Sequence, residues 1–134
     1  MRLNRLLPAA LLAIGLSVAG VPAVWAGADA VTFSQAAFSA SQQAGKPILV
    51  EITAPWCPVC AKQRPILSQL LSEPAFEHLV VYHIDFDSQK DAVREMGANM
   101  QSTLIVFNGS HEEGRSTGAT DPEAIKALLA KAAG

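Results

Sequence analysis

The feature that most constrains the fold of this chain is a pair of cysteines between a predicted strand and a predicted helix. The run Ile48–Thr53 is short, mostly apolar and rich in β-branched residues, which is typical of a buried strand. Pro55 ends this pattern because it cannot donate a hydrogen bond to a sheet. Cys57 and Cys60 follow at the start of a run of helix-forming residues, with Pro58 at its first position. The sequence therefore places Cys57 at the N-terminus of a helix.

This position favours redox chemistry. Free N–H groups and the positive end of a helix dipole stabilise negative charge, so Cys57 is expected to be an exposed, attacking thiolate. Cys60 lies one turn further on, close enough to form a disulfide with Cys57, and is expected to be the more buried, resolving thiol. A structural zinc site would need four ligands, and the chain has only two cysteines and three scattered histidines. A purely structural disulfide would stabilise little, because it closes a very short loop.

The first 26 residues are expected to form a secretory signal peptide. Two arginines precede the apolar run Leu6–Gly20, and Val24–Ala26 offers small residues for a signal peptidase. Cleavage after residue 26 leaves one domain of 108 residues, 27–134; cleavage after Ala30 is the second possibility. An uncleaved anchor is the alternative, but the apolar run is short for a span of about 20 residues. We therefore expect a soluble, periplasmic product.

The charge of the expected mature chain excludes some partners. Removing Arg2 and Arg5 leaves eight basic and twelve acidic residues, a net charge of −4. A mildly acidic domain without a basic cluster argues against nucleic acid or an anionic membrane as a partner. In an exported protein, a lone cysteine pair acts either as an oxidant or as a reductant that an electron donor keeps reduced.

The remaining pattern predicts an α/β domain. Helices are expected over residues 31–44, with Thr32 or Ser34 as the N-cap, over 58–71 and 88–96, and over 122–132, with Asp121 as the N-cap. Strands are expected over 48–53, 78–87, 103–107 and 112–117. Gly45, Asn108–Gly109 and Gly118 are turn signals between these elements. This order predicts a mixed β-sheet of four to five strands with helices on both faces.

Over nearly all of residues 31–132 the chain resembles the thioredoxin family. The resemblance rests on the sequence Trp-Cys-x-x-Cys with Pro65 five residues later, on the segments HIDFD and TLIVF followed by Asn-Gly, and on the C-terminal helix. It implies a thioredoxin-like fold and thiol–disulfide exchange with protein substrates, in which Cys57 attacks and Cys60 resolves the mixed disulfide. We also expect a monomer that needs no cofactor or metal and is recycled by a membrane or envelope redox partner. Because the signal peptide is expected to be cleaved, we expect no stable insertion in the membrane.

The resemblance also implies roles for neighbouring residues. Glu51 stands where thioredoxins carry a buried acid, and would accept a proton when the mixed disulfide resolves; a carboxylate reaching water is the alternative. His83 aligns with a lysine that partners this acid, and could equally be a satisfied core residue. The expected docking surface for substrates is formed by Trp56, Pro58, Ser102 and Thr103, although Trp56 could also pack over the cysteine loop.

Ser102 departs from the family pattern, which has a cis-proline at this position. A non-proline cis bond costs ~2.5–4 kcal/mol, so we expect a trans peptide here and a different presentation of the substrate groove. The family's proline also keeps metals away from the thiols. Its absence supports an alternative function, a soft-metal (copper) binding or delivery module that uses both cysteines, with Met100 and a histidine as possible further ligands.

The direction of electron flow depends on how strongly the residues around Cys57 stabilise its thiolate. Val59, unlike the histidine of many periplasmic oxidants, cannot stabilise the Cys57 thiolate. Since a more stable thiolate makes a stronger oxidant, we expect a reductant or a weak oxidoreductase. A thioredoxin-like fold used only for docking is the third alternative, and the intact cysteine pair argues against it.

Overall fold

The computed structural model describes residues 30–134, so the signal-peptide prediction for residues 1–26 lies outside the described residues. The strands are β1 (Val31–Thr32), β2 (Pro47–Thr53), β3 (Val80–Asp85), β4 (Thr103–Asn108) and β5 (His111–Thr117). The helices are α1 (Gln35–Gln43), α2 (Pro58–Leu71), the short 3₁₀ helix η1 (Pro74–Phe76), α3 (Lys90–Glu95) and α4 (Pro122–Ala133). No helix in this part of the chain is long and apolar enough to cross a bilayer.

The five strands form one mixed sheet in the order β1-β3-β2-β4-β5. β3 pairs in parallel with both β1 and β2, whereas β4 runs antiparallel to β2 and to β5. In the central strand β2, Glu51 lies between His83 of β3 and Leu104 of β4. The expected mixed sheet is confirmed.

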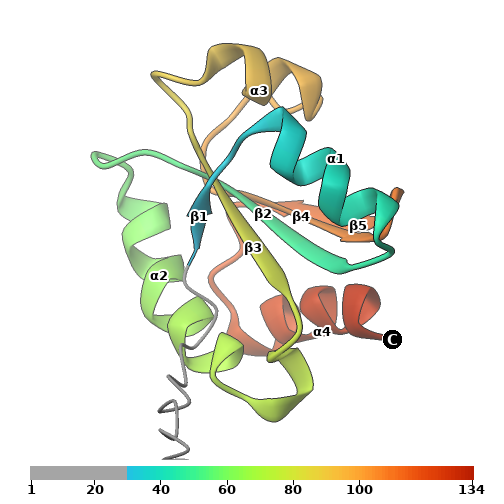
Figure 1. Ribbon diagram of the computed structural model, residues 1–134. Coiled ribbons are helices and arrows are strands. Elements are labelled where there is room, and N and C mark those ends of the chain that lie inside the picture. The colour runs from blue at the N-terminus through green and yellow to red at the C-terminus, as the bar shows by residue number, and fades with distance from the viewer. Residues whose placement is uncertain (1–29) are drawn as a thin grey trace, which may run out of the picture.

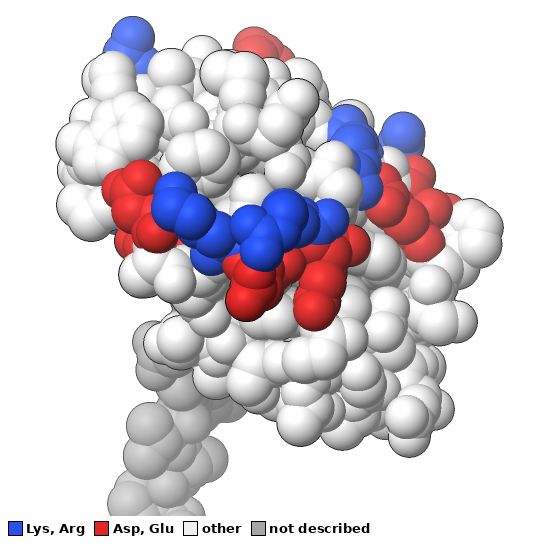
Figure 2. All heavy atoms as spheres, turned by 90° about the horizontal axis from the view of Figure 1, so that it is seen from above, with Lys and Arg blue, Asp and Glu red and all other residues white. Residues whose placement is uncertain are grey.

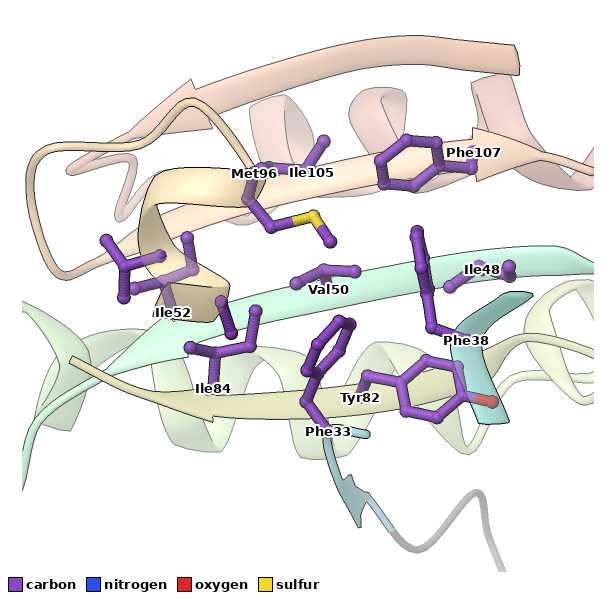
Figure 3. Close-up of a cluster of buried hydrophobic side chains, with 12 residues drawn as sticks. Phe33, Phe38, Ile48, Val50, Ile52, Tyr82, Ile84, Met96, Ile105 and Phe107 are labelled. Carbon is purple, nitrogen blue, oxygen red and sulfur yellow. The ribbon is translucent and has the colours of Figure 1, made fainter. Parts of the chain in front are cut away.

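Helices cover both faces of the sheet, α1 and α3 on one and α2 and α4 on the other (Figure 1). On the first face, Ile48, Val50 and Ile52 of β2 join a buried cluster with Phe38 of α1 and Val93 of α3 (Figure 3). Their alternate spacing places all three on one side of the strand, as the period of two for a strand requires. Each is 1% exposed or less, and full burial of such a side chain stabilises the fold by about 1.5–3 kcal/mol.

On the second face, Leu49 of β2 joins Leu67 and Leu70 of α2 and Ile125 and Leu129 of α4. These contacts fix α2 against the sheet beside α4. Because α2 begins five residues after β2 ends, this packing also fixes the position of its first turn.

Of the two expected caps of the first helix, Ser34 is the one that the structure uses, and residues 31–33 are not helical. The first helix begins at Gln35 rather than Val31, and Ser34 caps it by accepting a hydrogen bond from the Ala37 N–H at 3.2 Å. Val31 instead belongs to β1, opposite Tyr82 of β3. The other predicted elements are present, with ends shifted by up to two residues.

Candidate functional site

The two cysteines lie at the N-terminus of α2 and form a disulfide, with their Cα atoms 5.3 Å apart. Cys57 is the N-cap of α2, and Pro58 is its first residue. The Cys60 N–H donates to Cys57 Sγ at 3.1 Å, so one free donor of the first helical turn is directed at that sulfur. Pro65 lies inside α2 without ending it. The predicted strand–cysteine–helix arrangement is confirmed.

Both cysteines are buried in the disulfide form. Cys57 is 1% exposed and Cys60 is 4% exposed, and they cluster with Ala54, Val59 and Phe86. The prediction of an exposed Cys57 and a more deeply buried Cys60 is therefore wrong for this form. Val59 and Phe86 are the reason, because their partly buried apolar side chains pack against the disulfide.

Glu51 and His83 form an ion pair across neighbouring strands, with His83 Nε2 2.7 Å from Glu51 Oε2. The carboxylate side chain is 13% exposed and the imidazole 43%, so Glu51 is largely buried and His83 reaches solvent. The hydrogen bond to Glu51 raises the pKa of His83 above its ordinary value, although partial desolvation and the charge of Arg64 act in the opposite direction. The structure thus pairs His83 with the acid and does not place it in the core.

A cavity of about 290 Å³ connects this pair with the disulfide. Its lining includes Glu51, His83, Cys60 and Arg64, whereas Cys57 is not part of it. The two cysteines therefore have different surroundings: Cys60, unlike Cys57, shares a largely apolar cavity with the Glu51 carboxylate and the His83 imidazole, which can accept or release protons.

Trp56 and Pro58 are exposed beside the disulfide. Trp56 is 60% exposed, and its indole Nε1 donates to Asp87 Oδ2 at 2.7 Å. This hydrogen bond holds the ring at the surface by its edge. Both residues are accessible to a partner in the disulfide form.

Ser102 and Thr103 are buried, so their side chains are not accessible to a partner. The Thr103 hydroxyl donates to the Met100 carbonyl at 2.9 Å and lies 2.9 Å from the Thr117 hydroxyl. The described residues contain no cis peptide bond, which confirms the trans expectation for Ser102, and Ser102 has a left-handed φ of 59°. Both residues are buried together with their backbone, so in the disulfide form they do not contribute to the docking surface that was predicted for them.

Gln63 belongs to this site and was not predicted. It is 4% exposed, and its side-chain Nε2 donates to the carbonyls of Ser102 at 3.2 Å and Ala119 at 2.9 Å. Nothing in the sequence distinguishes it, because glutamine is an ordinary residue on exposed helix faces.

The distribution of charged side chains and of metal ligands bears on other classes of partner. Seen from above Figure 1, acidic and basic side chains lie next to one another in a mixed band rather than in a patch of one sign (Figure 2). Within residues 30–134, no three histidine, cysteine or acidic side chains come together as a metal site would require. The arrangement is suited to two-electron exchange between a dithiol and a disulfide, with proton acceptors on the Cys60 side.

Comparisons with known proteins agree with this geometry. The family model described as Thioredoxin matches residues 29–131. The chain is 28% identical to thioredoxin Asp f 29 of Aspergillus fumigatus over 92 residues, 66% of this chain and 84% of that protein. It is 32% identical over 97 residues to protein disulfide-isomerase tigA of Aspergillus niger, and this match covers 69% of this chain and 26% of that protein.

Solved structures give the same result. Trxlp from Edwardsiella tarda superposes with a TM-score of 0.71 and 40% identity, over 74% of this chain and 98% of that one. Thioredoxin Mala s 13 of Malassezia sympodialis superposes with a TM-score of 0.70 at 20% identity, over 80% and 93% of the two chains, and supports the fold alone.

Proposed function

Because this chain belongs to the thioredoxin family and is a thiol–disulfide oxidoreductase, we propose that it is exported and reduces protein disulfides through Cys57 and Cys60. The observation that carries the proposal is the Cys57–Cys60 disulfide at the N-terminus of α2. A free Cys57 at that position would be stabilised as a thiolate by the helix dipole and by the Cys60 N–H.

In the proposed reaction, the Cys57 thiolate attacks one sulfur of a substrate disulfide and releases the other as a thiolate. Cys60 then loses its proton and attacks Cys57 Sγ in the mixed disulfide. The Cys57–Cys60 disulfide forms, the second substrate thiolate leaves, and two electrons have passed to the substrate. An envelope redox partner must then supply two electrons to restore the dithiol of this monomeric protein.

The roles of the two cysteines are tested by trapping. Cys60→Ser should accumulate a mixed disulfide between Cys57 and an oxidised protein substrate, visible by mass spectrometry of the unreduced sample. Cys57→Ser is the matched control and should trap nothing. If Cys57→Ser trapped the substrate instead, the assignment of attacking and resolving thiols would be reversed.

Glu51 is proposed as the acceptor of the Cys60 proton, because both residues line the same cavity. Glu51→Gln keeps the size of the side chain and removes the acceptor. We expect it to slow the resolving step by about 10²-fold, within the range typical of general base catalysis, and to leave the first attack within about threefold. Rapid-quench measurement of the mixed disulfide separates the two steps, and equal slowing of both would exclude this role.

We propose that the protein reduces its substrates. Val59, between the two cysteines, is apolar and donates no hydrogen bond that would stabilise a Cys57 thiolate. We expect a reduction potential closer to about −270 mV, as in thioredoxin, than to about −120 mV, as in a strong oxidant. Equilibration of the metal-free protein in thiol buffers measures it. A potential near the oxidant value would show that the protein donates disulfides.

Export is proposed from the N-terminal sequence, and the family match that begins only at residue 29 supports it. Intact-mass measurement of protein from the periplasmic fraction should give a chain that starts at residue 27 or 31. Retention of the full chain in the cytoplasm would contradict this proposal.

The copper alternative is tested with the same purified dithiol protein. It is favoured by the absence of proline at Ser102 and by Met100, which is 50% exposed on the preceding loop. Titration with Cu(I) against a competing chelator should show weak binding if exchange is the function. Tight one-to-one binding that is lost in Met100→Leu would instead favour metal delivery.

A further inference from the structure

The residue at the family's cis-proline position has an unusual backbone. Ser102 is the only residue other than glycine in the described range 30–134 with a positive φ, at 59°. The left-handed region is unfavourable for residues with a Cβ atom, and such residues persist where the surrounding structure holds them. Gly118 is also left-handed, with φ of 78°, and its N–H donates to the Ser102 carbonyl at 2.9 Å.

Gln63 donates a second hydrogen bond to the same carbonyl. Its Nε2 atom donates to Ser102 O and Ala119 O, which belong to two different loops, one before β4 and one before α4. Gln63 is itself buried and lies three residues after Cys60 on α2. A single buried amide therefore connects the helix that carries the disulfide to both loops.

The loop held in this way lies at the end of the sheet where the disulfide is found. Thr103, which follows Ser102, pairs with Ile52 near the end of β2, and the cysteine segment begins directly after that strand. The loop residue Met100 is half exposed, and the Thr103 hydroxyl holds its carbonyl. The loop thus has two fixed points: Met100 through Thr103, and Ser102 through Gln63.

We propose that Gln63 is a positioning residue that holds the trans, left-handed Ser102 turn, and with it the loop at residues 99–101, in the conformation that receives a protein substrate. The inference rests on the proposed function and adds a specificity-determining residue to it. Gln63 takes no part in bond exchange. Because this chain has no proline at position 102, the two hydrogen bonds of Gln63 keep the loop rigid instead.

The principal test is Gln63→Met, which keeps an unbranched side chain of similar length and removes both donors. Gln69→Met, an exposed position on the same helix, is the matched control. We expect Gln63→Met to lower kcat/KM for reduction of insulin about tenfold, mainly through KM, as the loss of one or two buried hydrogen bonds would. The rate with oxidised glutathione, which is too small to need the loop, should stay within about twofold because the chemistry at the cysteines is unchanged.

Coupling to Ser102 distinguishes positioning from a general structural role. Ser102→Gly permits the left-handed turn without a Cβ penalty, so in this background Gln63→Met should cost only about two- to threefold. If Gln63→Met fails to fold, Ser102→Val tests the same turn from the other side, since a β-branched residue disfavours a positive φ. It should reproduce the selective loss with insulin.

Amide hydrogen exchange gives a readout that does not depend on activity. In Gln63→Met, exchange at residues 99–103 should accelerate by about tenfold or more, without a comparable change in β2. Unchanged exchange, an equal loss with insulin and glutathione, or a full tenfold loss in the Ser102→Gly background would each overturn the inference. Failure of the wild-type protein to reduce either compound would refute the proposed function, and the exchange result would still decide the role of Gln63.

Discussion

Replacing His83 with glutamine tests whether the ion pair with Glu51 makes the stability of this protein depend on pH near neutrality. His83 Nε2 lies 2.7 Å from Glu51 Oε2, and this contact raises the pKa of His83 in the folded protein. Glutamine preserves a neutral hydrogen-bond donor and removes the titrating charge. The difference between the two proteins therefore reports the charge of the imidazole.

The sign follows from the raised pKa. A group whose pKa is higher in the folded than in the unfolded state stabilises the fold fully below the unfolded value, about 6.5 for histidine. That contribution is lost as the pH rises through the folded value. Wild type should thus be more stable than His83→Gln at about pH 6, and the difference should shrink above pH 6.5.

The magnitude is set by burial. Exposed ion pairs contribute roughly 0.2–1 kcal/mol. The imidazole is 43% exposed, which allows solvent screening, but the carboxylate is only 13% exposed. We therefore expect roughly 0.5–1 kcal/mol at about pH 6 and close to zero at about pH 8.5, after discounting for the exposed imidazole.

The assay is urea unfolding of both oxidised proteins at these two pH values. With a slope of roughly 1–1.5 kcal/mol/M, the midpoint of wild type should exceed that of His83→Gln by about 0.5 M at the lower pH only. Other titrating groups are common to both proteins and cancel in the difference. A difference that is the same at both pH values, or that grows as the pH rises, would refute the reasoning.

Three further predictions concern the framework that holds the site, and urea unfolding checks each of them. Leu129→Ala should lower the free energy of unfolding by about 2–5 kcal/mol because Leu129 is fully buried between α4 and the sheet, whereas Leu71→Ala, at a partly buried position at the end of α2, should cost less. Asp121→Ala should cost about 1 kcal/mol, because its carboxylate caps α4 by accepting from the Ala124 N–H at 2.8 Å, and Asp121→Asn should restore most of it. Gly118→Ala should cost about 1–2 kcal/mol from its φ of 78° alone, because no atom lies within 4 Å of the added Cβ; no loss would contradict the left-handed backbone there.

The parts of the fold that the sequence predicted are those with strong local signals. The strand before the cysteines, the helix after them and the helix capped by Asp121 all follow from apolar period, proline position and capping chemistry. β1 was missed because it has only two exposed residues, and its identity as a strand comes from pairing with β3, about fifty residues away in sequence.

The parts of the site that were missed depend on tertiary contacts. Glutamine is common on exposed helix faces, so the sequence does not predict that Gln63 is buried. Its two hydrogen bonds go to the loops before β4 and α4, whose positions relative to α2 are set only by the tertiary fold. The positive φ of Ser102 was also not predicted, because a glycine indicates a left-handed backbone and a serine does not. The exposure of Cys57 was misjudged because it depends on Phe86, which follows a different strand.

The central strand has a consequence for how the protein unfolds. Ile48, Val50 and Ile52 belong to the cluster on one face of the sheet, and Leu49 belongs to the cluster on the other. Neither helical layer can lose its packing without exposing the same strand, so the two layers should melt in a single cooperative transition. Damage to the layer farther from the cysteines would then lower the population of active molecules as much as damage beside them.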